Sequence, residues 1–257
     1  MSLYKIQRIE KLNQDTFLFR IDSPEIASKA KAGQFVNVLC GDGLNAYLRR
    51  PISICRTDRV NLTFDIVFQI RGKGTRLLAE FKEGQELDVL GPLGNSFALN
   101  PAHENLIVMG GGIGIFPLLQ LLKDHPAKRK TAVLGFRNKA SVVLEKDFSE
   151  ACQSLLIATD DGSYGYKGFA PELFGDSLKK DRPDFAAMCG PLVMMKKGVG
   201  LCEHFAIESQ VSMEQRMGCG IGACLVCACK TRDKNDWTYS HVCKDGPIFN
   251  GKDILFD

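Results

Sequence analysis

Four cysteines near the carboxyl end of the chain have a spacing that could bind an iron–sulfur cluster. They follow the pattern C-x4-C-x2-C-x15-C, which is the plant-type arrangement of [2Fe–2S] ligands. The four are Cys219, Cys224, Cys227 and Cys243. Glycines alternate through the first part of this loop, at Gly218, Gly220 and Gly222. Because glycine tolerates positive φ, this loop can wrap closely and turn its amide N–H groups toward a negatively charged centre.

A structural zinc site is the alternative interpretation of the same cysteines. A four-cysteine zinc ribbon needs two C-x2-C pairs, and only Cys224 and Cys227 form one. Cys243 would then need help from Cys229 or His241. Cys229 lies outside the plant-type spacing, so we expect it to pack as a small apolar residue. The spacing favours the [2Fe–2S] cluster.

Two short motifs stand out in the first hundred residues. The segment Arg50-Pro51-Ile52-Ser53 closes one predicted strand, and Arg71-Gly72-Lys73-Gly74-Thr75 leads into a helix predicted to begin near Arg76. Each motif is weak alone, because an arginine on a strand is usually solvated and Gly-Thr can start any helix. The two motifs are informative only because they occur together in one small predicted unit.

A glycine turn suggests a nucleotide site further along the chain. An apolar strand, Leu106–Met109, precedes Gly110, Gly111, Gly112 and Gly114. The run is not the G-x-G-x-x-G fingerprint, since Pro117 stands where its last small residue would be. Tight packing at the strand end is the plain alternative. A second turn, Cys189-Gly190-Pro191, follows another strand, and no histidine or basic cluster in the sequence stands near Cys189 to activate it as a nucleophile.

Composition sets the class of protein and its partners. The 257 residues are 45% hydrophobic and 25% charged, which excludes disorder, collagen and coiled coil. The net charge of +3 gives no reason to expect nucleic acid or an anionic membrane as the main partner. Ten unevenly placed cysteines and an amino terminus without an apolar signal region predict a reducing, cytoplasmic location.

The stretch from Leu106 to Leu122 has no charged residue and approaches the length of a membrane span. Its glycines and Pro117 interrupt it. A buried strand, a turn and the start of a helix therefore explain it better than a membrane helix does.

The elements that must position these motifs fall into three predicted units. Before residue 100, alternating apolar residues predict a small antiparallel barrel with one helix, Thr75–Phe81; its strands are Thr16–Ile21, Phe35–Cys40, Leu62–Ile70 and Leu87–Leu90. Apolar strands then alternate with helical stretches, which predicts an α/β domain with a parallel sheet; these strands are Leu106–Met109, Thr131–Phe136, Leu155–Thr159 and Phe185–Met188. The fold class is thus α+β and multidomain: a barrel over 1–99, an α/β nucleotide-binding domain over 100–208 and a small cluster domain over 209–257.

With the three units in this order, the chain resembles the ferredoxin–NADP reductase superfamily. Within it, the chain is most similar to the electron-transfer subunits of type B, NAD-dependent dihydroorotate dehydrogenases, over nearly its whole length. The carrying segments are Arg50–Ile54, Gly72–Leu78, Thr159–Gly165, Cys189–Pro191, Ser212–Cys224 and Val242–Pro247. The departures are small: Gly218 where the family often has alanine, Gln69 where arginine or lysine is common, and the extra Cys229.

The resemblance implies roles for the motif residues. Arg50 would contact the FAD pyrophosphate and Ser53 the flavin N5, with Pro51 and Ile52 between them, while Gly74 and Thr75 would take a phosphate. Val67, Phe68 and Gln69 would lie on a strand that faces FAD. The turns Gly110–Gly114 and Cys189-Gly190 would lie beside the nicotinamide.

The resemblance also implies an electron relay, without a catalytic acid or base in this chain. A partner FMN-containing catalytic subunit would oxidise dihydroorotate to orotate in pyrimidine biosynthesis. Electrons would then pass through the [2Fe–2S] cluster to FAD and on to NAD+, in a heterotetramer of two copies of each subunit. Two alternatives stay open: the small subunit of an NADH-dependent ferredoxin:NADP or sulfide oxidoreductase, and a zinc-stabilised interaction module without redox activity.

Overall fold

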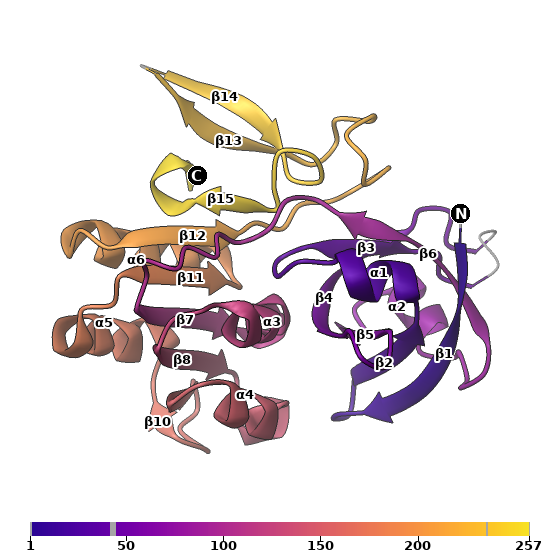
Figure 1. Ribbon diagram of the computed structural model, residues 1–257, viewed down its shortest axis with the longest axis horizontal. Coiled ribbons are helices and arrows are strands. Elements are labelled where there is room, and N and C mark those ends of the chain that lie inside the picture. The colour runs from indigo at the N-terminus through magenta and orange to yellow at the C-terminus, as the bar shows by residue number, and fades with distance from the viewer. Residues whose placement is uncertain (1, 42–44, 235, 257) are drawn as a thin grey trace.

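The computed structural model describes residues 2–41, 45–234 and 236–256. Figure 1 shows a β-barrel on one side, an α/β unit on the other, and a two-stranded hairpin above them. The barrel closes in the strand order β1-β2-β5-β4-β3-β6, and the α/β unit has a seven-stranded sheet. These features confirm the predicted fold class.

The barrel is antiparallel throughout, and its closure leaves no free edge strand. Its strands are β1 (Ser2–Lys11), β2 (Thr16–Asp22), β3 (Phe35–Val38), β4 (Arg50–Asp58), β5 (Thr63–Gln69) and β6 (Glu86–Leu93). Two short helices, α1 (Pro24–Lys29) and α2 (Lys73–Leu78), lie between them. Alternate residues such as Val36, Ile54 and Ile66 fill the interior.

The structure corrects four details of the barrel. Leu62 is not on the strand: it is 41% exposed, has a φ of 56° and precedes β5. Arg50 opens β4 instead of closing a strand, and the helix after it begins at Lys73, not near Arg76. Helix α1 was missed, although Ser23 caps it by accepting a hydrogen bond from the Ile26 amide.

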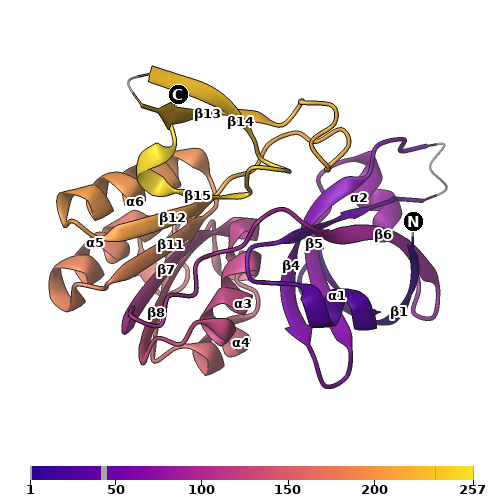
Figure 2. The same ribbon diagram turned by 45° about the horizontal axis from the view of Figure 1, so that its top comes forward.

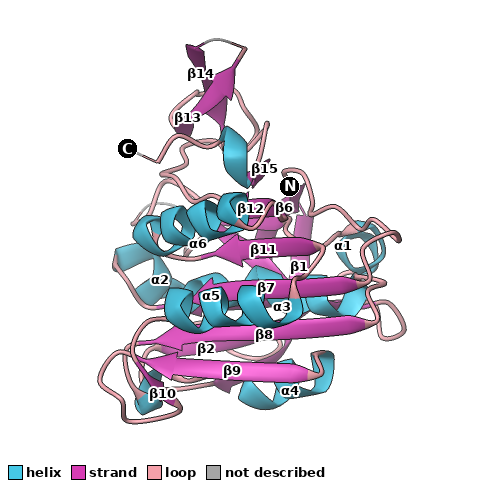
Figure 3. Ribbon diagram, turned by 90° about the vertical axis from the view of Figure 1, so that its left-hand side faces the viewer, coloured by secondary structure: helices cyan, strands magenta, loops and turns pink. Residues whose placement is uncertain are grey.

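The α/β unit has a sheet in the order β10-β9-β8-β7-β11-β12-β15, parallel except for β15. Figure 3 shows the central strands side by side. Its strands are β7 (Asn105–Gly111), β8 (Arg129–Phe136), β9 (Ser154–Thr159), β10 (Tyr166–Lys167), β11 (Phe185–Cys189), β12 (Glu208–Ser212) and β15 (Ile248–Asn250). Strands β7, β8 and β9 run in sequence toward one edge, and β11 lies on the other side of β7, so the topology reverses between β7 and β11. Ligands of open α/β sheets bind at such a point, beyond the carboxyl ends of the strands.

Helices cover both faces of this sheet, as its apolar strands require. In Figure 1, α5 and α6 lie on the outer face, and α3 and α4 lie between the sheet and the barrel. The helical segments are η1 (Gly112–Ile115), α3 (Phe116–Asp124), η2 (Lys139–Ser141), α4 (Glu145–Ala151), α5 (Ala170–Asp181), α6 (Leu192–His204) and η3 (Gly251–Asp253). Among the residues that the structure describes, no helix is long and apolar enough to cross a membrane.

The carboxyl-terminal part of the chain is joined to the sheet. Strands β12 and β15 both belong to it, and between them β13 (Ala228–Asp233) and β14 (Asp236–His241) form a separate hairpin. Figures 1 and 2 show the segment between β12 and β13 arching from the sheet toward the barrel. The predicted boundary at 208/209 falls at the start of β12 and stays a prediction.

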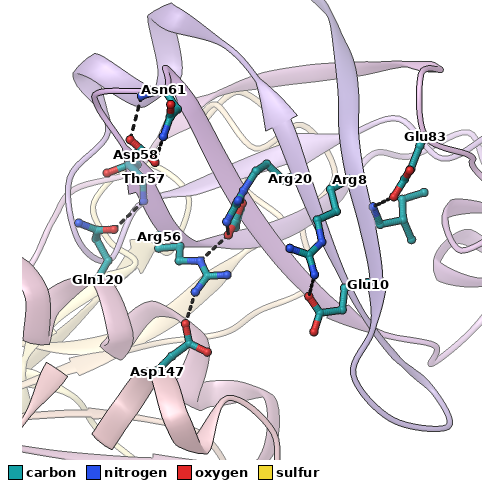
Figure 4. Close-up of polar contacts among 12 residues, drawn as sticks. Arg8, Glu10, Arg20, Arg56, Thr57, Asp58, Asn61, Glu83, Gln120 and Asp147 are labelled. Carbon is teal, nitrogen blue, oxygen red and sulfur yellow. Dashed lines mark hydrogen bonds and ion pairs between the residues drawn. The ribbon is translucent and has the colours of Figure 1, made fainter. Parts of the chain in front are cut away.

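A polar network joins the barrel to the α/β unit, as Figure 4 shows. The Arg56 guanidinium pairs with Asp65 inside the barrel wall and with Asp147 of α4. Beside it, the Thr57 amide donates a 2.7 Å hydrogen bond to Oε1 of Gln120 on α3. These contacts fix how the two units meet, which sets the shape of the cleft between them.

Candidate cofactor sites

The cluster loop turns backbone amides onto the four predicted cysteines. The Ile221, Ala223 and Cys224 amides donate to Sγ of Cys219 at 3.3–3.4 Å. The three remaining N–H···S contacts are Cys219 to Cys224 at 3.3 Å, Gly222 to Cys243 at 3.1 Å and Cys243 to Cys227 at 3.4 Å. Such donors stabilise sulfur that carries negative charge. The site therefore fits a bound [2Fe–2S] cluster, whose ligands are thiolates.

The thiols of this loop differ in acidity. Amide donors, the Ile221 N–H first, lower the pKa of Cys219 to about 6. Burial, and then Cys227, raise the pKa of Cys243 to about 12. A coordinated cation deprotonates a thiol outright. Cys219 would therefore bind a metal readily as a thiolate, whereas Cys243 would need the charge of a bound metal to lose its proton.

The described residues do not include a site for a single metal ion. In the described residues, no three His, Cys, Asp or Glu side chains form a group that could hold one metal ion. A [2Fe–2S] cluster needs no such group, because four cysteines share its two irons.

Cys229 is 7% exposed on β13 and belongs to the apolar core, where burial raises the pKa of its thiol to about 11. Its surroundings are those of a packing residue.

The two flavin motifs meet in space. Arg50 opens β4, and its guanidinium lies over the first turn of α2: a Cβ on Gly74 would come 2.6 Å from Nε of Arg50. The Thr75 hydroxyl accepts hydrogen bonds from the Arg71 and Gly72 amides, so it fixes the helix start. A guanidinium beside a helix N-terminus suits a phosphate group. The contacts of Arg50, Gly74 and Thr75 with FAD stay predictions.

Strand alternation divides the other predicted flavin residues. On β4, Ile52 points into the barrel core, so Pro51 and Ser53 share the opposite face. On β5, Phe68 belongs to the core and stacks on Phe17, with ring centroids 5.9 Å apart. Of the three predicted residues on that strand, only Val67 and Gln69 share the other face. Phe68 can therefore offer a bound cofactor its backbone alone.

The two predicted nicotinamide turns pack directly on each other. Strand β7 lies beside β11, with Gly110 opposite Cys189. A Cβ on Gly114 would meet the Cys189 carbonyl oxygen at 2.5 Å, and one on Gly111 would meet Sδ of Met194 at 2.8 Å. These two glycines therefore serve close packing. Gly112, with a φ of 56° and nothing within 4 Å of its Cβ position, faces open space.

A cleft of about 430 Å³ separates the barrel from the α/β unit at this edge of the sheet. One wall carries Gln69, whose Nε2 donates to Asp15 at 2.7 Å, and the other carries Gly112. Arg71 of the second flavin motif also lines the cleft. The lining residues that no predicted motif included are Asn13, Gln14, Asp15, Thr16, Ile113, Phe116, Phe136, Arg137, Asn138, Ala140, Ser141 and Val143. For the lining residues of the α/β unit, their position after the carboxyl ends of β7 and β8 was the available signal. Burial raises the pKa of the nearby Cys189 to about 12, so this thiol stays protonated.

Similar proteins agree with this geometry. Residues 214–255 match the family described as the iron-sulfur cluster binding domain of dihydroorotate dehydrogenase B. The chain is 35% identical to the dihydroorotate dehydrogenase B (NAD(+)), electron transfer subunit of Desulforamulus reducens, covering 98% of this chain and 97% of that protein. It is 40% identical to the subunit of the same name from Lysinibacillus sphaericus, covering 88% and 87%.

Solved structures agree on the fold. A chain in the structure of an NADH-dependent reduced ferredoxin-NADP oxidoreductase superposes with a TM-score of 0.86 at 30% identity, covering 100% of this chain and 91% of that one. A ferredoxin NADP+ reductase from Neisseria gonorrhoeae has a TM-score of 0.64 at 16% identity, covering 79% and 91%. The second likeness shows the fold alone.

Proposed function

This chain belongs to the family of dihydroorotate dehydrogenase B (NAD+) electron transfer subunits, and from that premise we propose that it links a partner catalytic subunit to NAD+. Its cofactors are a [2Fe–2S] cluster and FAD, which the cluster-binding family match and the reductase fold support. The FMN-containing partner oxidises dihydroorotate to orotate, and the electrons leave as NADH. A flavin converts between one-electron and two-electron carriers, which a cluster and a nicotinamide require.

One observation supports this proposal above the others: Cys219, Cys224 and Cys227 lie on one amide-lined loop against the barrel that holds the flavin motifs, and Cys243 returns to this loop from beyond the β13–β14 hairpin. Cys219, Cys224, Cys227 and Cys243 would hold the cluster. The strand Arg50–Ser53, with Gly74, Thr75, Val67 and Gln69, would hold FAD. The turns at Gly112 and Gly190, at the sheet edge, would admit the nicotinamide.

The surface around the cluster loop supports a docking subunit. Ile221, Leu225 and Val226 are 57%, 58% and 57% exposed, next to the ligand cysteines. Exposed apolar side chains grouped in this way mark protein interaction sites. We propose that the FMN subunit covers them in a complex of two copies of each chain. The name of the similar subunits supports pyrimidine synthesis as its setting. The uneven placing of its ten cysteines, with a cluster-type spacing in place of a disulfide scaffold, supports a reducing compartment such as the cytoplasm.

The alternative is the small subunit of an NADH-dependent ferredoxin:NADP or sulfide oxidoreductase. The superposition on a chain of the NADH-dependent reduced ferredoxin-NADP oxidoreductase, with a TM-score of 0.86, favours this alternative. Co-expression with an FMN-containing dihydroorotate dehydrogenase subunit distinguishes the two. We expect a complex that contains FAD, FMN and iron and that reduces NAD+ with dihydroorotate. A complex with all three cofactors that is inert to dihydroorotate would favour the alternative. Zinc in place of iron, without visible absorbance, would favour the interaction module.

A further inference from the structure

We propose that Asn37 is a positioning residue that anchors the cluster loop to the flavin strand through the backbone of Cys219. The inference rests on the proposed function, because it assigns the spacing between the two cofactors to one side chain. Neither the cysteine pattern nor the flavin motifs include Asn37.

The alternation of β3 places Asn37 on the outside of the barrel. Val36 and Val38 belong to the barrel core, whereas Phe35 packs in the core cluster that contains Cys227 and Cys243. Asn37 shares the face of Phe35 because side chains two apart on a strand point the same way. This short strand therefore has one face in the barrel and the other against the cluster unit.

Asn37 contacts the cluster loop directly. Its Nδ2 donates a 3.1 Å hydrogen bond to the carbonyl oxygen of Cys219. A Cβ on the next residue, Gly220, would come 2.4 Å from that same Nδ2, and Gly220 has a φ of +76°. Only glycine allows this backbone to approach the amide so closely.

The side-chain amide of Asn37 is buried, although burying it costs free energy that packing alone does not explain. Asn37 is 1% exposed, and its Oδ1 is buried with no hydrogen-bond partner among the described residues. An unpaired buried polar atom destabilises a fold, so an apolar residue would suit the strand better. The backbone at this point is also held, because Nη1 of Arg49 donates to the Asn37 carbonyl at 3.3 Å. Arg49 in turn pairs with Asp88 at 2.6 Å.

The register of the barrel places this anchor beside the flavin motif. Asn37 lies directly opposite Pro51, and Phe35 lies opposite Ser53. Directly opposed residues of antiparallel strands share a face. The side chain that holds the Cys219 backbone therefore stands next to the strand predicted to hold FAD. A shift at Asn37 would move the cluster relative to the flavin without touching a ligand of either.

The test uses the complex with its catalytic subunit and two variants, Asn37→Leu and Asn37→Asp. The leucine removes the donor outright. The aspartate removes the amide donor and, where it is ionised, adds a negative charge that should also shift the cluster midpoint potential to a more negative value. We expect faster hydrogen exchange over residues 216–224 in both variants. We also expect electron transfer between cluster and FAD to slow by about 10- to 100-fold, the range for outer-shell mutations at metal sites. Flavin reduction by NADH, followed at the flavin absorbance, should keep its rate.

Asn105→Leu is the matched control. Asn105 is 4% exposed and donates a 3.0 Å hydrogen bond to the Asp181 carbonyl, inside the α/β unit and away from the cluster. Its loss should leave exchange over 216–224 and the cluster potential unchanged. Equal effects from the Asn37 and Asn105 variants would overturn the inference, as would Asn37 variants that match wild type.

Gly220→Ala tests the same contact from the loop side if the Asn37 variants fold poorly. Its Cβ displaces Asn37, so exchange over 216–224 should rise with Asn37 intact, and the double variant with Asn37→Leu should show non-additive effects. Additive effects, or unchanged exchange, would overturn the inference. These outcomes differ from failure of the proposed function, which would appear in the wild-type complex as missing cofactors or no activity with dihydroorotate.

Discussion

Arg50 and Gly74 are in direct contact: the guanidinium of the first lies where a side chain on the second would have to be. The two come from separate elements, β4 and the start of α2. The contact gives the pairing of two weak sequence motifs a physical basis, because a cation and free helix N–H groups converge on one place.

Gly74→Ala is therefore expected to weaken FAD binding at least tenfold, because the new methyl group displaces Arg50. Flavin content after purification, and rebinding of added FAD followed by fluorescence quenching, measure the effect. Gly72→Ala is the matched control: it lies two residues away, and nothing is within 4 Å of its Cβ position. Equal flavin loss from both variants would contradict the assigned contact.

Cys224→Ser is expected to abolish the cluster and leave FAD and NADH-to-dye activity largely intact, because the flavin and nicotinamide motifs lie on other elements. Iron and sulfide analysis, with the visible spectrum, measures the loss. Cys229→Ala should keep the cluster, because Cys229 packs in the core. Loss of FAD together with the cluster would count against separate cofactor sites.

The sequence predicted the parts of this molecule that depend on local pattern. Alternation predicted strands β2, β3, β5 and β6 of the barrel, and continuous apolar runs predicted β7, β8, β9 and β11 of the sheet. The cysteine spacing picked out four residues that six N–H···S contacts bring together, although Cys243 lies beyond the β13–β14 hairpin. Leu62 was wrongly placed on the strand, because it continues the apolar alternation of β5 but has a φ of 56° and precedes the strand. The helix start was placed late, since Gly72 caps it without a side chain.

The sequence could not predict contacts between residues that lie far apart in the chain. The packing of Gly114 on the Cys189 carbonyl and the ion pair of Arg56 with Asp147 depend on how separate elements meet. Asn37 did leave a signal. It is a polar residue inside the apolar run Phe35–Val38, and a buried polar residue is the informative exception in a core.

Asp65→Asn is expected to destabilise the protein by about 3 kcal/mol, because it leaves two arginines facing a neutral side chain in a buried network. The Asp65 side chain is 2% exposed and pairs with Arg20 at 2.9 Å and with Arg56. Figure 4 also shows the comparison pair, Arg8 with Glu10, whose side chains are 59% and 44% exposed. Glu10→Gln should cost less than about 1 kcal/mol. Urea unfolding of both variants measures the difference, and equal midpoints would contradict it.

Stability should fall as the pH is lowered from about 6.5 to about 4, because of His125. Burial, with the nearby His103 and Lys130, lowers the pKa of His125 to about 4. The unfolded chain, with an ordinary histidine pKa near ~6.5, binds the proton first in this window, so acid favours unfolding by up to about 3 kcal/mol. In the wild type, the Ala127 amide donates a 3.1 Å hydrogen bond to Nδ1 of His125. His125→Asn keeps an acceptor for this amide and should weaken the dependence of stability on pH. A pH dependence of unfolding that this variant leaves unaltered would disprove the assignment.

The most direct test of the relay follows the FAD absorbance after dihydroorotate is added, without oxygen or NAD+, to the complex with the FMN subunit. We predict that FAD is reduced in the wild-type complex. In the complex carrying Cys224→Ser, FMN should be reduced while FAD stays oxidised, because the cluster is the route between the flavins. FAD reduction at the wild-type rate without the cluster would contradict the account.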